Sequence, residues 1–329
     1  MKPGKGKAVD LRSFVEMEEP FEAEFVAFWK RKIRAGVSRG KFHAVVLGAS
    51  GGLDSAVCAA LSVAAGVPVV AVQMVDRRVR GETYNPGYFD ELGAERIPVD
   101  ITEEVADRER RLGLPPHWTT VLGLNLLVRV APRRMLWALM AQMKRSHADS
   151  RLGRHYERLL TAHRVRRCVL QTIAAKRGGA LLNCANRTEC ELGFFVEGGV
   201  DDVRFGQWAP LAGLYKFQVR RLARFLALPP RLLQQSPSPG FGGVRDEHFL
   251  GPYELVDRIL MGLNRGCSDA VILRALKDYA ERVGRPLSRR FRPFLRTAYV
   301  EHLRQLRHLS AAKRGEGGDG SCTPPIPSH

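Results

Sequence analysis

A glycine-rich turn with two serines and an aspartate is the part of the chain best suited to chemistry. Residues 47–55 read Leu-Gly-Ala-Ser-Gly-Gly-Leu-Asp-Ser and lie between the apolar run Ala44–Leu47 and a helix-like stretch at 56–65. Glycines let backbone N–H groups approach an anion closely, and the start of a helix adds a favourable dipole. The pattern predicts a phosphate-binding loop. Its residues are Ser50, Gly51, Gly52, Leu53, Asp54 and Ser55.

The details of this loop separate it from the commonest phosphate loop. The Gly-Lys-[Ser/Thr] ending and its long spacer are absent. Ser-Gly-Gly-x-Asp-Ser instead resembles the pyrophosphate loop of the ATP pyrophosphatases. This resemblance implies an enzyme that splits ATP into AMP and pyrophosphate to activate a carboxylate, carbonyl or thiocarbonyl carbon. A glycine turn with a purely structural role is the alternative.

Motifs in the second half of the chain narrow the choice among ATP pyrophosphatases. Residues 183–189 read Asn-Cys-Ala-Asn-Arg-Thr-Glu, and residues 210–216 read Pro-Leu-Ala-Gly-Leu-Tyr-Lys. Ser-Pro-Ser-Pro-Gly-Phe follows at 236–241, and Asp-Glu-His-Phe-Leu-Gly-Pro-Tyr at 246–253, with Asp257 shortly after. From the loop to about residue 262, this order resembles the ammonia-dependent NAD synthetases.

The resemblance implies a reaction and its co-substrates. It indicates an ATP-dependent, amide-forming ligase that adenylates the nicotinate carboxylate of deamido-NAD and lets ammonia displace AMP, which yields NAD. ATP and Mg²⁺ would both be needed. Members of the family form homodimers, so the resemblance also implies a homodimer. The chain offers no glutaminase region of its own. We therefore expect free ammonium or a separate glutaminase to supply the nitrogen.

The resemblance also assigns roles to single residues by their place in the motifs. Asp54 and Glu189 would share the magnesium ion, which prefers carboxylate and phosphate oxygens. Lys216 would contact the ATP phosphates, and Asp54 and Lys216 would be the catalytic residues. Besides these two and the loop, the positions that match ATP-binding residues of the family are Arg164, Cys184 and Ser238.

The segment expected to meet the acyl substrate departs from the family pattern. The family's turn carries Thr-Lys-Tyr-Gly-Asp-Gly-Gly, whereas residues 193–202 read Gly-Phe-Phe-Val-Glu-Gly-Gly-Val-Asp-Asp and lack that lysine, tyrosine and aspartate. The acceptor is therefore deamido-NAD or another carboxylate. The candidate acyl-substrate residues are Phe195, Glu197, Asp201 and Asp202.

Each candidate also has a plainer interpretation. Asp54 stands where an aspartate often caps a helix, and Glu189 or Lys216 could be a solvated surface charge. Ser238 lies between prolines, where serine commonly forms turns. Arg164 is followed by two more arginines within three residues, and any one of them could be the contact.

The elements that position these residues alternate between strand-like and helix-like runs. Strands and helices in alternation predict an α/β fold with a doubly wound parallel sheet, of the adenine nucleotide α hydrolase-like, Rossmann-like type. In such sheets a ligand binds beyond the carboxyl ends of the strands, where the loop lies. The expected strands are 44–47, 67–74, 96–101 and 180–184, and the helices that cross between them are 55–65, 83–95 and 155–175.

The chain is predicted to have three regions: an N-terminal helical extension over 1–40, the main domain over 41–310, and a disordered tail over 311–329. Residues 105–155 are apolar and basic with proline breaks, and we expect an inserted helical segment there that covers the site or makes a subunit contact. The expected C-terminal helices are 216–226, 252–262, 268–282 and 291–309.

The formal net charge of +18 suits nucleotides, phosphorylated ligands or nucleic acid. It keeps open a second class of function, an RNA-modifying ATP pyrophosphatase that thiolates a tRNA base or attaches an amine to it. The Asp-Glu, Leu-Gly and Tyr block disfavours that class. A non-catalytic nucleotide-binding role is the third possibility.

The six cysteines include no Cys-x-x-Cys pair, which argues against zinc ribbons and paired redox cysteines. Sulfur transfer by Cys184 or Cys190 stays open as a variant of the RNA-modifying class. The most apolar stretch, 121–143, is broken by Arg129, Pro132 and Arg133, so no membrane span is expected. With no secretory signal evident, we expect a cytoplasmic protein.

Overall fold

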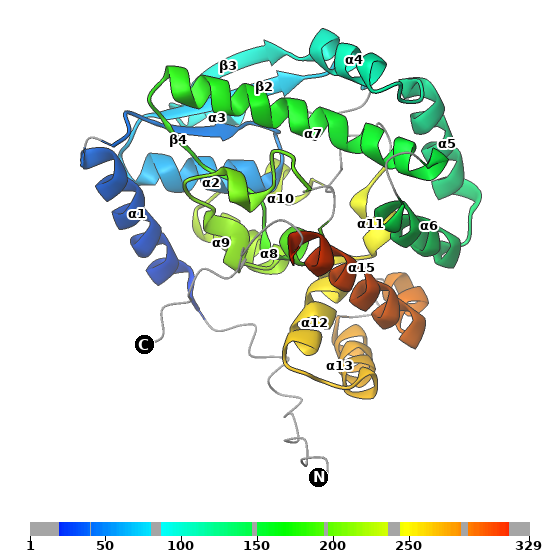
Figure 1. Ribbon diagram of the computed structural model, residues 1–329. Helices are drawn as coiled ribbons and strands as arrows, with labels where there is room; N and C mark the ends of the chain where they lie inside the picture. Colours follow the sequence, from blue (N-terminus) through cyan, green and yellow to red (C-terminus); the bar gives the residue numbers. More distant parts are fainter. Residues whose placement is uncertain are drawn as a thin grey trace.

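A parallel sheet of four strands lies at the centre of the part of the chain that the structure describes (Figure 1). The structure is a computed structural model that describes residues 20–39, 41–79, 87–146, 150–193, 197–235, 244–283 and 289–315. The strand order is β3-β2-β1-β4, and Val45 of the central strand pairs with Val69 on one side and Ala180 on the other. The strands are β1 (Val45–Gly48), β2 (Val69–Val75), β3 (Glu95–Asp100) and β4 (Ala180–Leu181).

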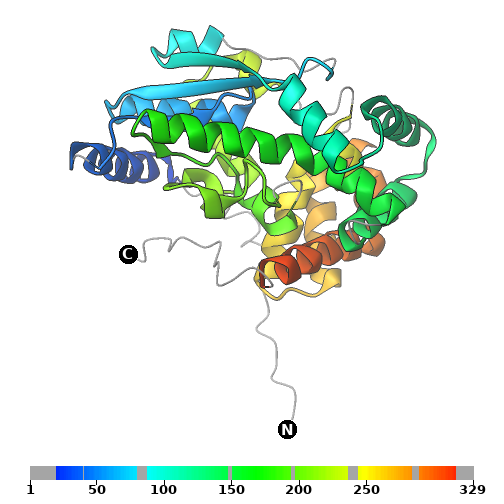
Figure 2. The same cartoon turned by 45° about the horizontal axis from the view of Figure 1, so that its top comes forward.

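Helices cover both faces of this sheet, because strand side chains alternate between two apolar layers. Val45 and Leu47 of β1 belong to the layer formed with α1, α2 and α9, whereas Val46 belongs to the layer formed with α4 and α7. Figure 2 shows α7 lying along the sheet. The predicted doubly wound α/β sheet is thus confirmed. These helices are α1 (Glu22–Ser38), α2 (Leu53–Ala64), α4 (Thr102–Arg111), α7 (Arg151–Lys176) and α9 (Lys216–Phe225).

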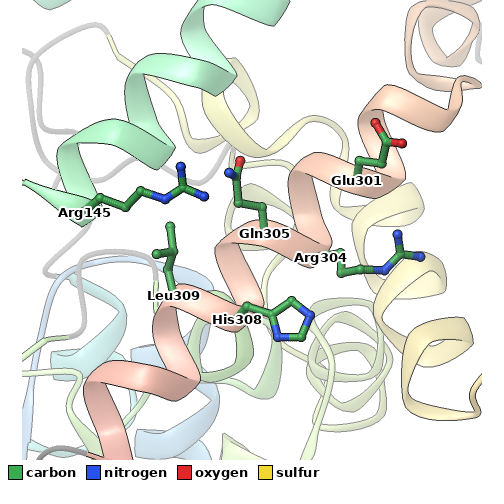
Figure 3. Close-up of a pocket in the computed structure, with 6 residues that line it drawn as sticks. All are labelled: Arg145, Glu301, Arg304, Gln305, His308 and Leu309. Atoms are coloured by element: carbon green, nitrogen blue, oxygen red, sulfur yellow. The ribbon is translucent and has the colours of Figure 1, made fainter.

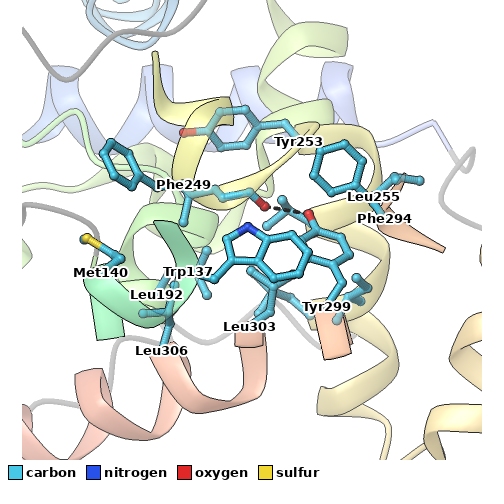
Figure 4. Packing of buried hydrophobic residues seen from close by; sticks show 14 of the residues in the cluster. Trp137, Met140, Leu192, Phe249, Tyr253, Leu255, Phe294, Tyr299, Leu303 and Leu306 are labelled. Atoms are coloured by element: carbon cyan, nitrogen blue, oxygen red, sulfur yellow. Dashed lines mark hydrogen bonds between the residues drawn. The ribbon is translucent and has the colours of Figure 1, made fainter. Parts of the chain in front are cut away.

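A second apolar core forms where the C-terminal helices pack against α6. The ring of Trp137 stacks on that of Tyr299 with the centroids 5.2 Å apart, and the Tyr299 hydroxyl donates a 2.5 Å hydrogen bond to the Leu250 carbonyl (Figure 4). This core fixes α11 and α12, which carry carboxylates of the candidate site. Its helices are α6 (Arg133–Arg145), α11 (Asp246–Leu250), α12 (Tyr253–Asn264), α13 (Asp269–Arg282) and α15 (Thr297–Gly315).

The remaining elements are short, apart from α5, which lies at an outer edge of the molecule in both views (Figures 1 and 2). They are α3 (Gly87–Glu91), α5 (His117–Val130), α8 (Arg187–Leu192), α10 (Pro230–Leu233), and the 3-10 turns η3 (Val203–Phe205), η4 (Pro210–Gly213) and η5 (Arg292–Phe294).

Some predicted boundaries were wrong. The fourth strand is two residues long instead of five, because Leu182 forms only an isolated bridge with Trp208 and the Asn183 N–H donates to the Trp208 carbonyl. The helix predicted over 83–95 is seen only as α3, and β3 already begins at Glu95. Helix α15 runs past the predicted start of the tail to Gly315. Phe195 and Ser238 lie outside the described residues, as do 1–19 and 316–329.

The order of the strands places the switch point of the sheet between β1 and β4. Chain connections lead from β1 through β2 to β3 on one side, and to β4 on the other. The loops that follow β1 and β4 therefore diverge from adjacent strand ends, and a ligand can bind between them. These loops lead to Asp54 and to Glu189, so the fold brings the two predicted metal ligands to one place.

Candidate active site

Asp54 and Lys216, which are 162 residues apart in the sequence, form an ion pair at this switch point. Lys216 Nζ lies 2.5 Å from Asp54 Oδ2, and Asn186 Nδ2 donates to the same oxygen at 3.3 Å. Asp54 is the second residue of α2, whose N-cap is Gly52, so it is not a helix cap. The Lys216 side chain is 5% exposed, which excludes a solvated lysine.

The loop before α2 is organised by its two serines. Ser50 Oγ accepts a hydrogen bond from the Gly52 N–H at 3.2 Å and lies 3.1 Å from Ser55 Oγ, which donates to the Gly52 carbonyl at 2.9 Å. Gly51 has φ +77°, a conformation that favours glycine. The first turn of a helix leaves its N–H groups without intrahelical acceptors. The loop thus presents donors beside the Asp54–Lys216 pair, as a phosphate cradle requires.

Glu189 lies in the first turn of α8, with Lys216 Nζ 3.8 Å from its carboxylate. Its other oxygen accepts from the Asn186 N–H, and the Asn186 side chain accepts from the Glu189 N–H, so the two residues form a capping box. Burial and then the negative charge of Asp54 raise the pKa of Glu189 to about 8, although Lys216 opposes this. The carboxylate is recessed, with 18% of the side chain exposed, and is not a solvated surface group.

The carboxylates next to Lys216 keep its ammonium group protonated. Burial alone would lower the pKa of this lysine, but the carboxylates of Asp54 and Glu189 outweigh that effect and raise it to about 12. Lys216 is therefore a permanent cation beside the loop at neutral pH. An ammonium group held there can stabilise the negative charge of a phosphate that leaves as pyrophosphate.

Asp257, a motif residue to which sequence analysis assigned no role, holds the backbone around Lys216 in place. It is completely buried on α12 and accepts hydrogen bonds from Thr188 Oγ1 at 2.6 Å and from the Phe217 N–H at 2.9 Å. Thr188 Oγ1 in turn accepts from the Lys216 N–H at 3.1 Å. One carboxylate thus joins the first turn of α8 to the first turn of α9. Such a link depends on three-dimensional contacts and has no signal in sequence spacing.

Two more carboxylates add negative charge to the site. Asp246 is buried at the start of α11 and accepts a 2.7 Å hydrogen bond from Tyr253, and burial raises its pKa to about 6. Asp201, one of the predicted acyl-substrate residues, also has its pKa raised to about 6, by burial and by the charge of Asp54. Asp201 therefore lies within electrostatic range of the Asp54–Lys216 pair.

The three neighbouring arginines of α7 interact with different partners. Arg164, the predicted ATP contact, pairs with Glu157 of its own helix. The positive charge of Arg166 acts on Asp201, and Arg167 donates to the Gly198 carbonyl at 2.8 Å. Of the three arginines that the sequence offered here, Arg164 is paired within its own helix, and Arg166 is the one whose charge acts on a carboxylate of the candidate site.

Asp202 and Glu197, the other described acyl-substrate candidates, are held by the protein itself. Asp202 accepts from the Gly198 N–H at 3.0 Å and forms an ion pair with Arg204, and it caps η3. Glu197 forms an ion pair with Lys144 at 3.2 Å. Of the described candidates in this loop, Asp201 is the one whose pKa is raised by the charge of Asp54, and its carboxylate lies 3.9 Å from His163 Nδ1.

Cys184 lies after β4, where its sulfur is 3.9 Å from the Leu182 carbonyl. Burial, and then the neighbouring Cys184, raise the pKa of the Cys58 thiol of α2 well above its usual range. The pair resembles small packed side chains more than a sulfur-transfer site.

We expect Cys184→Ala to keep the rate of pyrophosphate release within about threefold of the wild type, because the change removes a small packed side chain and no charge. Cys267→Ala, at a buried cysteine that the sulfur-transfer hypothesis does not include, is the matched control. Steady-state assays of both variants would show the result. A large loss in Cys184→Ala alone would restore the sulfur-transfer hypothesis.

A hollow of about 520 Å³ lies elsewhere, between the end of α6 and α15 (Figure 3). None of the site residues lines it. The lining residues are Arg145, Glu301, Arg304, Gln305, His308 and Leu309.

The sheet, the phosphate cradle and the charge pair define an α/β enzyme of the adenine nucleotide α hydrolase-like class. A family model described as NAD synthase matches residues 25–113 and 138–289. The chain therefore belongs to the NAD synthase family, whose members are ligases that form carbon–nitrogen bonds. The matched regions leave out 114–137, a narrower segment than the predicted 105–155 insertion.

Individual relatives agree with this placement. The NH(3)-dependent NAD(+) synthetase of Thermotoga maritima is 31% identical over 257 residues, which cover 73% of this chain and 85% of the relative. The Coprothermobacter proteolyticus NH(3)-dependent NAD(+) synthetase is 42% identical over a shorter stretch of 106 residues, 32% of this chain and 35% of that relative.

Solved structures support the fold. NMN synthetase from Francisella tularensis has a TM-score of 0.57 at 20% identity and covers 75% of this chain and 92% of its own. The NH3-dependent NAD synthetase from Campylobacter jejuni has a TM-score of 0.54 at 17% identity and covers 92% of this chain and 98% of its own. Within the described residues, every helix is too short or too polar to cross a bilayer.

Proposed function

We propose that this protein converts deamido-NAD to NAD, using ATP and ammonia and releasing AMP and pyrophosphate. The observation that carries the proposal is the Asp54–Lys216 ion pair, which joins the Ser-Gly-Gly loop to the Gly-Leu-Tyr-Lys segment across the switch point. Family membership supplies the reaction type. The RNA-modifying alternative has the net charge of +18 as its main support, and the family match weighs against it.

The chemistry follows from the charges around the loop. The nicotinate carboxylate attacks the α-phosphorus of ATP, the bond to the β-phosphate oxygen breaks, and pyrophosphate leaves with the electron pair. Lys216 and the loop N–H groups near Ser50 and Ser55 would stabilise that leaving charge. Ammonia then attacks the acyl adenylate, AMP leaves, and one proton is lost to a base or to water.

Asp54 and Glu189 would hold Mg²⁺ at this site. Asp54 Oδ1 is buried without a hydrogen-bond partner, and the Lys216 ammonium lies against both carboxylates, so the residues present suit a cation with phosphate oxygens completing its shell. Among the described residues no three metal-binding side chains cluster, and magnesium bound to a nucleotide needs only one or two carboxylates. When bound, the ion would neutralise phosphate charge.

The two remaining substrates are the acyl acceptor and the nitrogen donor. Asp201 is the described residue best placed to face the acyl acceptor, since it responds to the charges of Asp54 and Lys216. Free ammonium or a separate glutaminase would supply the nitrogen. We expect the enzyme to work in the cytoplasm, where deamido-NAD, ATP and ammonia are available.

The function is tested by pyrophosphate release with two acceptors, deamido-NAD and nicotinate mononucleotide, each with Mg-ATP and ammonium. We expect release with deamido-NAD to exceed release with the mononucleotide. A preference for the mononucleotide would identify a different nicotinate carboxylate as the substrate. Release with neither, from protein that binds ATP, would contradict the proposal.

A homodimer is also part of the proposal, and the exposed face of α5 supports it. Trp118, Leu122, Leu126 and Val130 recur every four residues, and each side chain is more than half exposed. Contiguous apolar surface of this kind marks an interaction site more often than a solvated face. In a two-fold dimer the stripe would pack against its own copy.

We expect Leu122→Asp combined with Leu126→Asp to raise the dimer dissociation constant about a hundredfold or more, because two carboxylates would be buried on each side. Analytical ultracentrifugation over a range of concentrations would measure it. Phe225→Asp, at an equally exposed apolar position on α9, serves as the control. Equal association of both variants, or a monomeric wild type, would disprove this dimer face.

A further inference from the structure

Lys144, near the end of α6, is a fully buried lysine at the edge of the candidate site. Its Nζ donates to the carbonyls of Leu192 at 2.9 Å and Gly193 at 2.6 Å, and it lies 3.2 Å from Glu197 Oε1. None of the Lys144 side chain is exposed. Burial of an ammonium is costly unless it is paired and hydrogen-bonded. This lysine therefore belongs to a built arrangement and is not an incidental surface charge.

The carbonyls that Lys144 binds are those at the end of α8. Helix α8 ends at Leu192 and is capped by Gly193 in the left-handed conformation, with φ +58°. The last carbonyls of a helix lack intrahelical donors and carry the negative end of its dipole, so a buried cation stabilises them. Lys144 therefore stabilises the end of α8 and holds Gly193, the first residue of the segment expected to bind the acyl substrate.

The ion pair with Glu197 connects Lys144 to residues 193–202, the segment expected to bind the acyl substrate and called the acyl-substrate loop below. Glu197 also acts on Tyr156 of α7, because its negative charge adds to burial in raising the pKa of the tyrosine. Lys144 thus holds Gly193 before residues 194–196 and Glu197 after them. The same loop continues through Gly198 and Val200, whose carbonyl accepts a 3.1 Å hydrogen bond from Asn183 Nδ2 after β4, to Asp201, whose pKa is raised by the charge of Asp54 as well as by burial.

We propose that Lys144 is a positioning residue for the acyl acceptor: by binding the end of α8 and Glu197 together, it sets the place of the loop that carries Asp201. The proposal rests on the proposed function and deepens it. Glu197 then acts as a counter-ion for Lys144, and it does not bind the acceptor directly. The ATP cradle at Ser50 to Ser55 is built from β1 and α2 and does not depend on this contact.

The test is Lys144→Met, which keeps most of the length of the side chain and removes the charge. We expect KM for deamido-NAD to rise about ten- to a hundredfold, as misplacement of a binding loop does, with KM for ATP changed less than about twofold. Arg145→Met, the next residue on α6 and an exposed one, is the matched control and should change neither value. An unchanged KM for deamido-NAD, or an equal rise in both KM values, would overturn the proposal.

Hydrogen exchange gives a readout that does not depend on the acyl substrate. In Lys144→Met, amides of 187–193 and 197–206 should exchange faster, with those of α2 unaffected, and unchanged exchange would overturn the proposal. If Lys144→Met does not fold, Glu197→Gln removes only the ion pair and should raise KM for deamido-NAD in the same direction, by a smaller factor. Failure of the proposed function is distinct, since the wild type itself would then make no NAD.

Discussion

Replacing Asp54 with asparagine is expected to reduce turnover by about a thousandfold or more, and to lower the free energy of unfolding by up to about 3 kcal/mol because it removes one partner of a buried ion pair. The substitution removes the charge that attracts Lys216 and the expected magnesium ligand, but keeps the shape of the side chain. Asp54 Oδ1 has no hydrogen-bond partner within the protein, so no internal bond compensates. Initial rates of pyrophosphate release, with thermal unfolding measured in parallel, would give the result.

Asp269→Asn is the matched control for this change. Asp269 also lies in the first turn of a helix, α13, and also pairs with a cation, Arg304, but it is remote from the loop. We expect its rate to stay within about twofold of the wild type. An unaffected rate in Asp54→Asn would reject the assignment of this residue to magnesium and to catalysis.

Lys216→Met is expected to lower kcat about a hundred- to a thousandfold. The side chain is buried between Asp54 and Glu189, and its charge would act on the leaving pyrophosphate, so most of the loss should appear in kcat instead of KM for ATP. Removing one partner of a buried ion pair leaves carboxylates unpaired, and the free energy of unfolding should fall by about 3 kcal/mol. Steady-state kinetics and denaturant titration measure the two effects separately.

Added Mg-ATP should restore part of the lost stability of Lys216→Met, because a bound cation would pair with the same carboxylates. Lys176→Met, at the exposed end of α7, is the control and should leave both quantities unchanged. A normal kcat in Lys216→Met would show that this lysine only balances charge in the folded protein.

The first three strands of the sheet and the Ser-Gly-Gly loop could be predicted from the sequence, because the residue patterns that indicate them are local. Apolar runs such as 44–47 and the glycine turn after them depend on neighbours along the chain, and strands β1, β2 and β3 were predicted to within two residues. The pairing of Asp54 with Lys216 could be anticipated only through resemblance, since no local pattern joins residues that distant.

Other parts of the site could not be predicted from the sequence, because they depend on contacts between side chains that are distant in the chain or alike in type. Arg164 pairs with Glu157 whereas the charge of Arg166 acts on Asp201, and neighbouring arginines look alike in sequence. Asp257 and Lys144 act through buried contacts between helices that are distant in the chain. Their burial is the informative feature, because buried charges are rare unless they are paired. The exposure of α5 likewise cannot be read from its apolar composition.

The central claim is that the protein forms an amide at the carboxylate of deamido-NAD, with ammonia as the nitrogen source. Mass spectrometry of products from protein, Mg-ATP, deamido-NAD and ammonium labelled with the heavy nitrogen isotope tests this most directly. We expect NAD that carries the heavy isotope, with AMP and pyrophosphate in equal amounts. ATP consumption without labelled NAD, or no AMP at all, from folded protein that binds ATP would contradict it.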